Sequence, residues 1–236
     1  MRKSIAMMMM LLLSVVGAMA QGVENPVGKF SIIPRVGVAI ANLTDNSMMV
    51  ASEQTSELKS KNQAGFLGGV DVEYRATDVL AVSLGAYYAR QGFRYADYEA
   101  MTEDGINIYS GVKNQHANID YIHVPLMLKA YVAPGLAVMA GAQMGFRCGD
   151  AKFMGESTEL EKDKNGSTTY KETTNFESTM PLKKVDVSIP LGLSYEYMNV
   201  ILDARYNIGL TNVNKGDISK SKNKVLTFTV GYRFTL

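Results

Sequence analysis

The feature that most constrains this fold is a strict alternation of apolar and polar residues, which returns along the whole chain. In the final segment, KVLTFTVGYRFTL, one side of an extended strand carries Leu226, Phe228, Val230, Tyr232, Phe234 and Leu236. Because strand side chains alternate with a period of two, the opposite side carries Thr227, Thr229, Gly231, Arg233 and Thr235. The segment therefore predicts a strand with one apolar and one polar face.

The same alternation recurs in seven further segments, so we expect eight strands. They span residues 30–41, 64–75, 80–91, 121–131, 136–147, 184–197, 200–210 and, for the segment quoted above, 224–236. The connections between them alternate in length. Short hairpins are expected around 76–78, 132–135 and 197–199, and long polar connections near 42–64, 92–117, 149–183 and 212–223. This alternation is typical of bacterial outer-membrane barrels, whose short turns face the periplasm.

The third long connection is a charged, Thr-rich tract. Two interpretations of it remain open. It extends a hairpin beyond the membrane, or it stays mobile without regular structure.

Eleven charged residues of the expected strands lie on the small and polar side, opposite the apolar side. They are Arg35, Asp71, Glu73, Arg75, Lys129, Arg147, Asp186, Glu196, Asp203, Arg205 and Arg233. A soluble barrel would turn its bulky apolar side inward, but the interior of eight strands is only just wide enough for side chains. A membrane barrel turns the apolar side to lipid and encloses the charged residues in an internal ion-pair network.

Strand length and charge placement both favour the membrane barrel. A strand of about 11 residues tilted by about 40° covers about 28 Å, close to the apolar band of such barrels. A charge facing lipid near mid-membrane would cost roughly 2–4 kcal/mol, and the placement of these eleven charges avoids that cost. We expect an all-β fold: an eight-stranded antiparallel up-and-down transmembrane β-barrel with short periplasmic turns, long extracellular loops and a filled lumen.

The N-terminal segment predicts export. Arg2 and Lys3 form a basic start, residues 5–16 are apolar, and residues 18–20 form an A-x-A cleavage site. The apolar stretch is shorter than the roughly 20 residues that a spanning helix needs, which disfavours the alternative of an N-terminal anchor. We expect a cleaved signal peptide at 1–20, one barrel domain at 21–236 and location in the outer membrane. The C-terminal strand, with alternating aromatic residues, resembles the signal that barrel-insertion machinery recognises, although Phe is commoner than Leu236 at the last position.

Two segments resemble a known family. YIHVPLMLKAYV, residues 121–132, resembles a characteristic strand of the PorT-like outer-membrane β-barrel proteins of Bacteroidetes. LGAYYARQGFRY, residues 84–95, is similar to the end of the strand that precedes it in that family. The resemblance implies an outer-membrane, eight-stranded barrel; PorT itself belongs to a secretion and gliding system.

No catalytic or ligand-binding motif stands out in the sequence. The formal net charge of +1 disfavours a nucleic-acid binder, and the single Cys148 excludes an intrachain disulfide. No metal-binding spacing, phosphate loop or nucleophile elbow is present, so we expect no metal, no cofactor and no enzymatic activity. His116 is expected in a polar loop, and His123 is read as a hydrogen-bonding group of the lumen rather than a catalytic residue.

The expected function is that of a structural, adhesion or partner-binding module in outer-membrane lipid, with an extracellular or secretion-system protein as partner. Long loops on a rigid scaffold often carry recognition. The candidates here are Tyr95, Tyr98, Tyr109, Tyr170 and Phe176. The alternatives are that these loops are merely solvated, that the barrel is a narrow pore for small solutes, or that it is a lipid-modifying enzyme.

Overall fold

The computed structural model describes residues 27–50, 56–104, 106–162, 167–215 and 220–236. The signal peptide predicted at 1–20 lies outside the described residues. Within these ranges, no helix has the length and apolar character needed to cross a bilayer.

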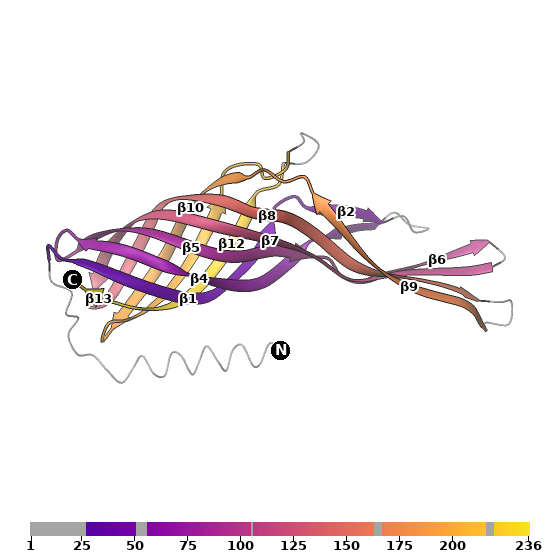
Figure 1. The fold of residues 1–236 in the computed structure, drawn as a ribbon, viewed down its shortest axis with the longest axis horizontal. Coiled ribbons are helices and arrows are strands. Elements are labelled where there is room, and N and C mark those ends of the chain that lie inside the picture. Colours follow the sequence, from indigo (N-terminus) through magenta and orange to yellow (C-terminus); the bar gives the residue numbers. More distant parts are fainter. Residues whose placement is uncertain (1–26, 51–55, 105, 163–166, 216–219) are drawn as a thin grey trace.

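Eight strands pair edge to edge into a closed ring (Figure 1). Each is antiparallel to its neighbours, and the last pairs with the first, so that the ring has no free edge. In ring order they are β1 (Phe30–Leu43), β4 (Lys61–Arg75), β5 (Leu80–Arg94), β7 (Ile106–Ala133), β8 (Leu136–Lys162), β10 (Val185–Tyr197), β11 (Val200–Gly209) and β12 (Asn223–Tyr232). A short β13 (Phe234–Thr235) continues β12 beyond Arg233 and also pairs with β1.

Within the described residues, three of the four long polar connections contain strands. Strands β7 and β8 run well past the ring, with β6 (Tyr98–Asp104) added on one side and β9 (Thr168–Met180) on the other. Of the two interpretations of residues 149–183, the extended hairpin is the one that the structure adopts. The first long connection forms a separate hairpin of β2 (Ser47–Val50) and β3 (Ser56–Lys59).

The short hairpins lie together at the opposite end of the ring from this extension (Figure 1). Between β10 and β11, Met198 and Asn199 have φ angles of 44° and 67°. Two consecutive positive φ angles are the geometry of a type I′ turn, whose twist matches that of antiparallel strands. Gly135, between β7 and β8, has a φ of 73°. The three turns predicted from the sequence therefore fall where expected.

The alternation in sequence becomes an alternation in burial. Along β5, Leu80, Val82 and Leu84 point outward and are exposed, whereas Ala81 and Ser83 point into the ring and are buried. The exposed apolar residues on the outside of the ring have between 37 and 60% of their surface accessible. The outside is therefore an apolar surface that no other part of the described chain covers.

A cluster of apolar side chains fills the ring at the end nearest the extension. It combines inward-facing residues of β1, β5, β7 and β8 with residues of the connections that follow β5, β9 and β11: Leu43, Phe93, Tyr95, Ala117, Ile119, Tyr121, Ala151, Leu182 and Val213. We call this set the apolar plug. It closes the lumen at one end.

Closure of the ring is testable by cross-linking. Val36 of β1 lies directly opposite Val230 of β12, and both side chains face outward. Opposed residues in an antiparallel pair are close enough for a disulfide. In a Cys148→Ser background, we expect the Val36→Cys/Val230→Cys variant to form an intramolecular disulfide on oxidation, seen as a mobility shift after denaturation. The pair Val36→Cys/Leu226→Cys is out of register by four residues and serves as the control; equal cross-linking in both pairs would contradict the closure register.

Candidate functional site

Two features of the molecule are candidates for function: the charged residues inside the ring and the sheet that extends beyond it. The first sets what can pass through the ring, and the second presents a surface outside it.

Inside the ring, two arginines and two aspartates form one compact cluster. Arg35 donates from Nε to Asp71 Oδ2 at 2.7 Å, and its Nη1 lies 2.6 Å from Asp203 Oδ2. Arg205 contacts the same two carboxylates, at 2.6 Å to Asp203 and 3.3 Å to Asp71. These side chains come from β1, β4 and β11 and are almost wholly buried. Each carboxylate therefore faces two guanidinium groups.

A second cluster lies nearer the short turns. Glu73 accepts hydrogen bonds from Lys129 Nζ at 2.5 Å and from Arg233 Nη2 at 2.7 Å. Arg233 also donates from Nε to Glu196 at 2.5 Å, and Tyr131 donates its hydroxyl to Glu73 at 3.3 Å. The Arg233 side chain enters the lumen at the point where β12 ends and β13 begins. The two clusters together hold four basic and four acidic side chains, so their formal charges cancel.

Glycines on neighbouring strands make room for these long side chains. Arg35 lies directly between Gly69 of β4 and Gly231 of β12. Asp71 lies opposite Gly85, where an added Cβ would be 2.3 Å from Asp71 Oδ1. The lumen is therefore packed by alternating large charged side chains with residues that have no side chain.

Three of the eleven predicted lumen residues make other contacts. Arg75 places its guanidinium 3.7 Å from the centre of the Tyr131 ring and donates to the carbonyl oxygens of Thr77 and Asp78. Arg147 donates to the carbonyl oxygen of Gly149. Asp186 accepts a hydrogen bond from the Asn223 amide at 2.6 Å. These three lie outside the two ion-pair clusters. Arg75 is the last residue of β4, beside a turn whose carbonyl oxygens accept, whereas Arg147 lies within β8, two residues before Gly149 with its φ of 64°.

Between the ion-pair clusters and the apolar plug lies a layer built around His123. Its Nε2 is 2.7 Å from Gln91 Nε2, its Nδ1 is 3.2 Å from Gln143 Nε2, and its ring stacks on Tyr121 at 5.2 Å. A neutral imidazole has one donor and one acceptor nitrogen, so one of the two glutamines must turn its carbonyl oxygen toward the ring. Sequence reasoning did not single out the two glutamines, although both lie on the predicted polar faces.

The cavity beside His123 is small. It has a volume of about 20 Å³ and is lined by Leu67, Tyr87, Gln91, His123, Gln143, Arg205, Asn207, Thr227 and Thr229. A cavity of this size has room for roughly one water molecule. The lumen is filled by side chains, and no group of His, Cys, Asp and Glu suited to a metal ion occurs among the described residues.

The predicted recognition residues divide by position. Tyr95 was expected on an exposed loop, but it is 9% exposed, packs in the apolar plug and donates its hydroxyl to Asn46. This expectation is wrong because the segment folds inward as a continuation of the lumen face of β5. Tyr98 lies half-buried on β6, and the side chain of Tyr109 lies outside the described part of the structure. Tyr170 is 43% exposed on β9, whereas Phe176 is half-buried against Phe153.

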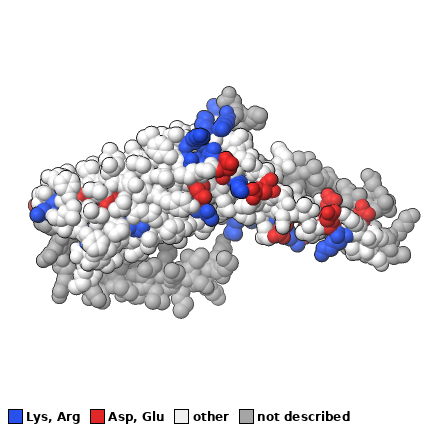
Figure 2. Space-filling model, viewed as in Figure 1, with Lys and Arg blue, Asp and Glu red and all other residues white. Residues whose placement is uncertain are grey.

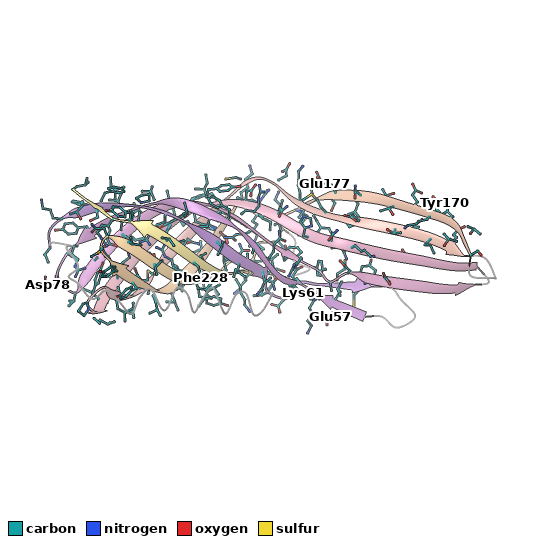
Figure 3. The ribbon with its side chains drawn as sticks, turned by 90° about the horizontal axis from the view of Figure 1, so that it is seen from below. Glu57, Lys61, Asp78, Tyr170, Glu177 and Phe228 are labelled. Carbon is teal, nitrogen blue, oxygen red and sulfur yellow. The ribbon has the colours of Figure 1, made fainter. Side chains whose placement is uncertain are left out.

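The sheet of β6, β7, β8 and β9, which we call the extension, continues the long axis of the ring (Figure 1). Figure 3 places Tyr170 and Glu177 on it, at the far end of the molecule from Asp78 in a short turn. Charged side chains gather over the junction and the extension, whereas the ring surface in view is largely uncharged (Figure 2). On the extension, Lys152 lies 2.7 Å from Glu177, and this hydrogen bond raises the pKa of the Lys152 ammonium group.

The ion-pair clusters give a prediction about stability. Replacing Glu73 by Gln leaves Lys129 and Arg233 buried without their shared carboxylate, which we expect to lower the free energy of unfolding by about 3–5 kcal/mol. The matched control is Asp120→Asn, which breaks the exposed Arg90–Asp120 pair at 2.9 Å and should cost about 0–1 kcal/mol. Guanidinium titration of the reconstituted protein measures both. Equal losses in the two variants would show that the lumen pairs do not stabilise the ring.

Comparisons with known proteins place this geometry in a family. The outer membrane protein beta-barrel domain family matches residues 19–215. Among solved structures, Ail, the attachment invasion locus protein of Yersinia pestis, is 17% identical with a TM-score of 0.41, covering 89% of this chain and all of that one. Neisserial surface protein A is 15% identical with a TM-score of 0.41, covering 87% and 97%. OprG from Pseudomonas aeruginosa is 13% identical with a TM-score of 0.36, covering 89% and 97%.

No curated protein matches the chain. The structural likenesses are too distant to carry an argument about activity. The family match covers most of the sequence, and the apolar outer surface of the closed ring agrees with it. The chain belongs to the outer membrane protein beta-barrel domain family, whose members lie in the lipid of the outer membrane.

Proposed function

We propose that this protein is an eight-stranded, up-and-down transmembrane barrel with a closed lumen, and that it acts as an adhesion or partner-binding module through its extension. In this proposal the short turns face the periplasm and β6 to β9 stand outside the cell. Export through a cleaved signal peptide and insertion by machinery that recognises the C-terminal strand are parts of the same proposal.

The observation that carries the proposal is the contrast between the two ends of the molecule. One end has tight turns, such as Met198–Asn199. The other continues as a sheet, with β9 exposed along nearly its whole length. A rigid scaffold that presents a large solvated surface on one side of a membrane is suited to recognition. The barrel fixes the position of that surface, and the surface supplies the contacts.

The lumen argues against the alternative of a pore. The two ion-pair clusters and the apolar plug lie in series along the ring axis, and the cavity between them is about 20 Å³. A solute would have to displace neutralised, hydrogen-bonded charges and then cross an apolar layer. The proposed function therefore does not include transport.

A conductance measurement tests this part of the proposal. We expect the purified full-length chain in planar lipid bilayers to give no steady current steps, because side chains occupy the whole cross-section. Insertion is verified independently by the shift in electrophoretic mobility between heated and unheated samples. Reproducible steps of one size from inserted protein would contradict a closed lumen.

The proposed role is non-enzymatic. His123 is held between Gln91 and Gln143 in the interior, and His116 contacts the carbonyl oxygen of Asn114 at 2.7 Å. Among the hydrogen bonds of the described residues, neither imidazole is bonded to a Ser hydroxyl together with a carboxylate. The PorT-like resemblance of residues 121–132 favours a partner in a secretion or gliding system; co-location of the gene with genes of such a system would support that narrower role.

Shortening the extension tests the proposed function directly. We replace residues 155–176 by an Asn-Gly turn, which suits a two-residue hairpin because the flanking residues Met154 and Glu177 are paired in the structure. Cells that display either form are tested for attachment to immobilised extracellular proteins and to a layer of cells displaying the full chain. We expect the shortened chain to insert normally, as judged by heat-dependent mobility, and to lose attachment. Unchanged attachment with normal insertion would contradict a binding role for the extension.

A further inference from the structure

The outer edge of β9 is the least protected backbone surface of the extension. Among the described residues, β9 pairs with β8 alone and lies at the end of the strand order. It has thirteen residues and no proline, and five of the thirteen are Thr, a good strand former. Exposed strand edges normally carry protection such as proline, central bulges, short length or charged side chains. Of these, β9 has only charged side chains, Lys171, Glu172 and Glu177, so a second strand can pair with it only in a register that matches these charges. In β9 the only register shift lies at its end, beside Lys162, so the rest of the edge is free to pair.

The sequence of β9 is complementary to itself when the strand is reversed. If two copies pair antiparallel around Thr174, Thr168 of one lies opposite Met180 of the other, and all thirteen residues are paired. In this register Lys171 of each copy faces Glu177 of the other. Both side chains are exposed and lie on the same face of the strand. Opposite charges directly across a strand pair stabilise it.

Neighbouring registers are less favourable. A shift by one residue in one direction places Glu172 opposite Glu177, and like charges directly opposed are destabilising. A register that pairs Lys171 with Glu172 keeps only eight residues in contact, by the bounds of β9. The register with complete overlap is therefore also the one with two symmetric ion pairs. In it, Glu177 lies between Lys152 of its own chain, at 2.7 Å, and Lys171 of the other copy.

The direction of β9 determines how the two copies sit. The extension follows the long axis of the ring (Figure 1), and β9 runs along that axis from Thr168 at the far tip back to Met180 near the ring. A two-fold axis that reverses the strand therefore points the two barrels toward each other. Thirteen paired residues span about 44 Å, which sets the separation between the two rims. Copies in one membrane have parallel β9 strands and are excluded from this pairing.

We propose that the occupant of the β9 edge is β9 of a second copy of this chain on a facing membrane, joined as a continuous eight-stranded sheet. This deepens the proposed function and rests on it, since the extension must stand outside the cell. The protein is then a homophilic adhesin, and the specificity comes from the Lys171–Glu177 pairs in the two-fold register.

Exchanging the charges tests the register. In cells that display Lys171→Glu alone, two acidic side chains face each other in both pairs; in cells that display Glu177→Lys alone, two basic side chains do. We expect each population to settle no faster than cells without the protein. A mixture of the two populations restores both ion pairs, so it should aggregate as the unaltered chain does. The measurement is the settling rate at equal surface levels of protein.

Lys113→Glu is the matched control, since Lys113 is exposed on β7 beside Glu99 and away from the β9 edge. It should leave aggregation unchanged. If the unaltered chain does not aggregate cells, if either single β9 variant aggregates like it, or if the mixture fails to aggregate, the proposal is wrong. Attachment to immobilised proteins that survives in the β9 variants while cell aggregation is absent would leave the proposed binding function intact and overturn only its homophilic form.

A cross-linking experiment examines the same pairing without cells. In the Cys148→Ser background, Thr174→Cys meets its own counterpart at the two-fold centre, within reach of a disulfide. Ser178→Cys faces Tyr170 of the other copy instead. We expect oxidation of the purified, detergent-solubilised chain to give a covalent dimer with Thr174→Cys and several-fold less with Ser178→Cys. Equal yields from the two variants, or no dimer from Thr174→Cys, would overturn the register.

Discussion

The structure depends on the mutual neutralisation of charged side chains inside a closed ring. Each cluster joins strands that are distant in sequence: Arg35, Asp71 and Asp203 connect β1, β4 and β11, and Glu73 connects β4 to Lys129 on β7. Buried charges are tolerated only when they are paired and hydrogen-bonded. If the ring opened in lipid, the same groups would meet acyl chains, together with unpaired backbone groups at two strand edges. Closure and charge pairing therefore support each other, and the apolar outer surface follows from both.

Because the lumen is filled in this way, functional contacts are expected outside the ring rather than along its axis. The ion-pair clusters, the His123 layer and the apolar plug succeed one another along the ring, and the cavity beside His123 has room for about one water molecule. The extension differs from the ring, since nearly all side chains of β9 are exposed and the ion pairs Lys113–Glu99 and Lys152–Glu177 lie in solvent. The ring acts as an anchor of fixed geometry, and the exposed sheet carries the proposed contacts.

The sequence predicted the ring strands well because each one separates two environments. An apolar exterior and a polar interior impose a period of two, which is why β5, predicted at 80–91, is observed at Leu80–Arg94. Beyond the ring both faces of a strand meet water, the alternation disappears, and β9 looks like a polar loop in the sequence. Tyr95 shows the reverse error, since its charged neighbours suggested a loop while its ring packs inside.

The polar faces could be assigned from the sequence, but the partners within the lumen could not. The residues directly opposite Arg35 on the two neighbouring strands are Gly69 and Gly231, which have no side chain. Its charged partners therefore lie at other heights along the ring axis. The stagger of the closed sheet determines which side chains face each other across the lumen, and no local sequence pattern encodes that stagger. The same reason explains Arg75, which was expected in the network but stacks on Tyr131 near a turn.

The most direct test of the central claim is a spin-label scan along β5 in lipid bilayers, in the Cys148→Ser background. If the apolar face meets lipid, labels at Leu80, Val82 and Leu84 collide with oxygen dissolved in the membrane, whereas labels at Ala81 and Ser83 are shielded from both oxygen and a water-soluble relaxation agent. A period of two in oxygen access would place the apolar face against lipid. Oxygen access at Ala81 and Ser83, with the apolar positions shielded, would contradict it.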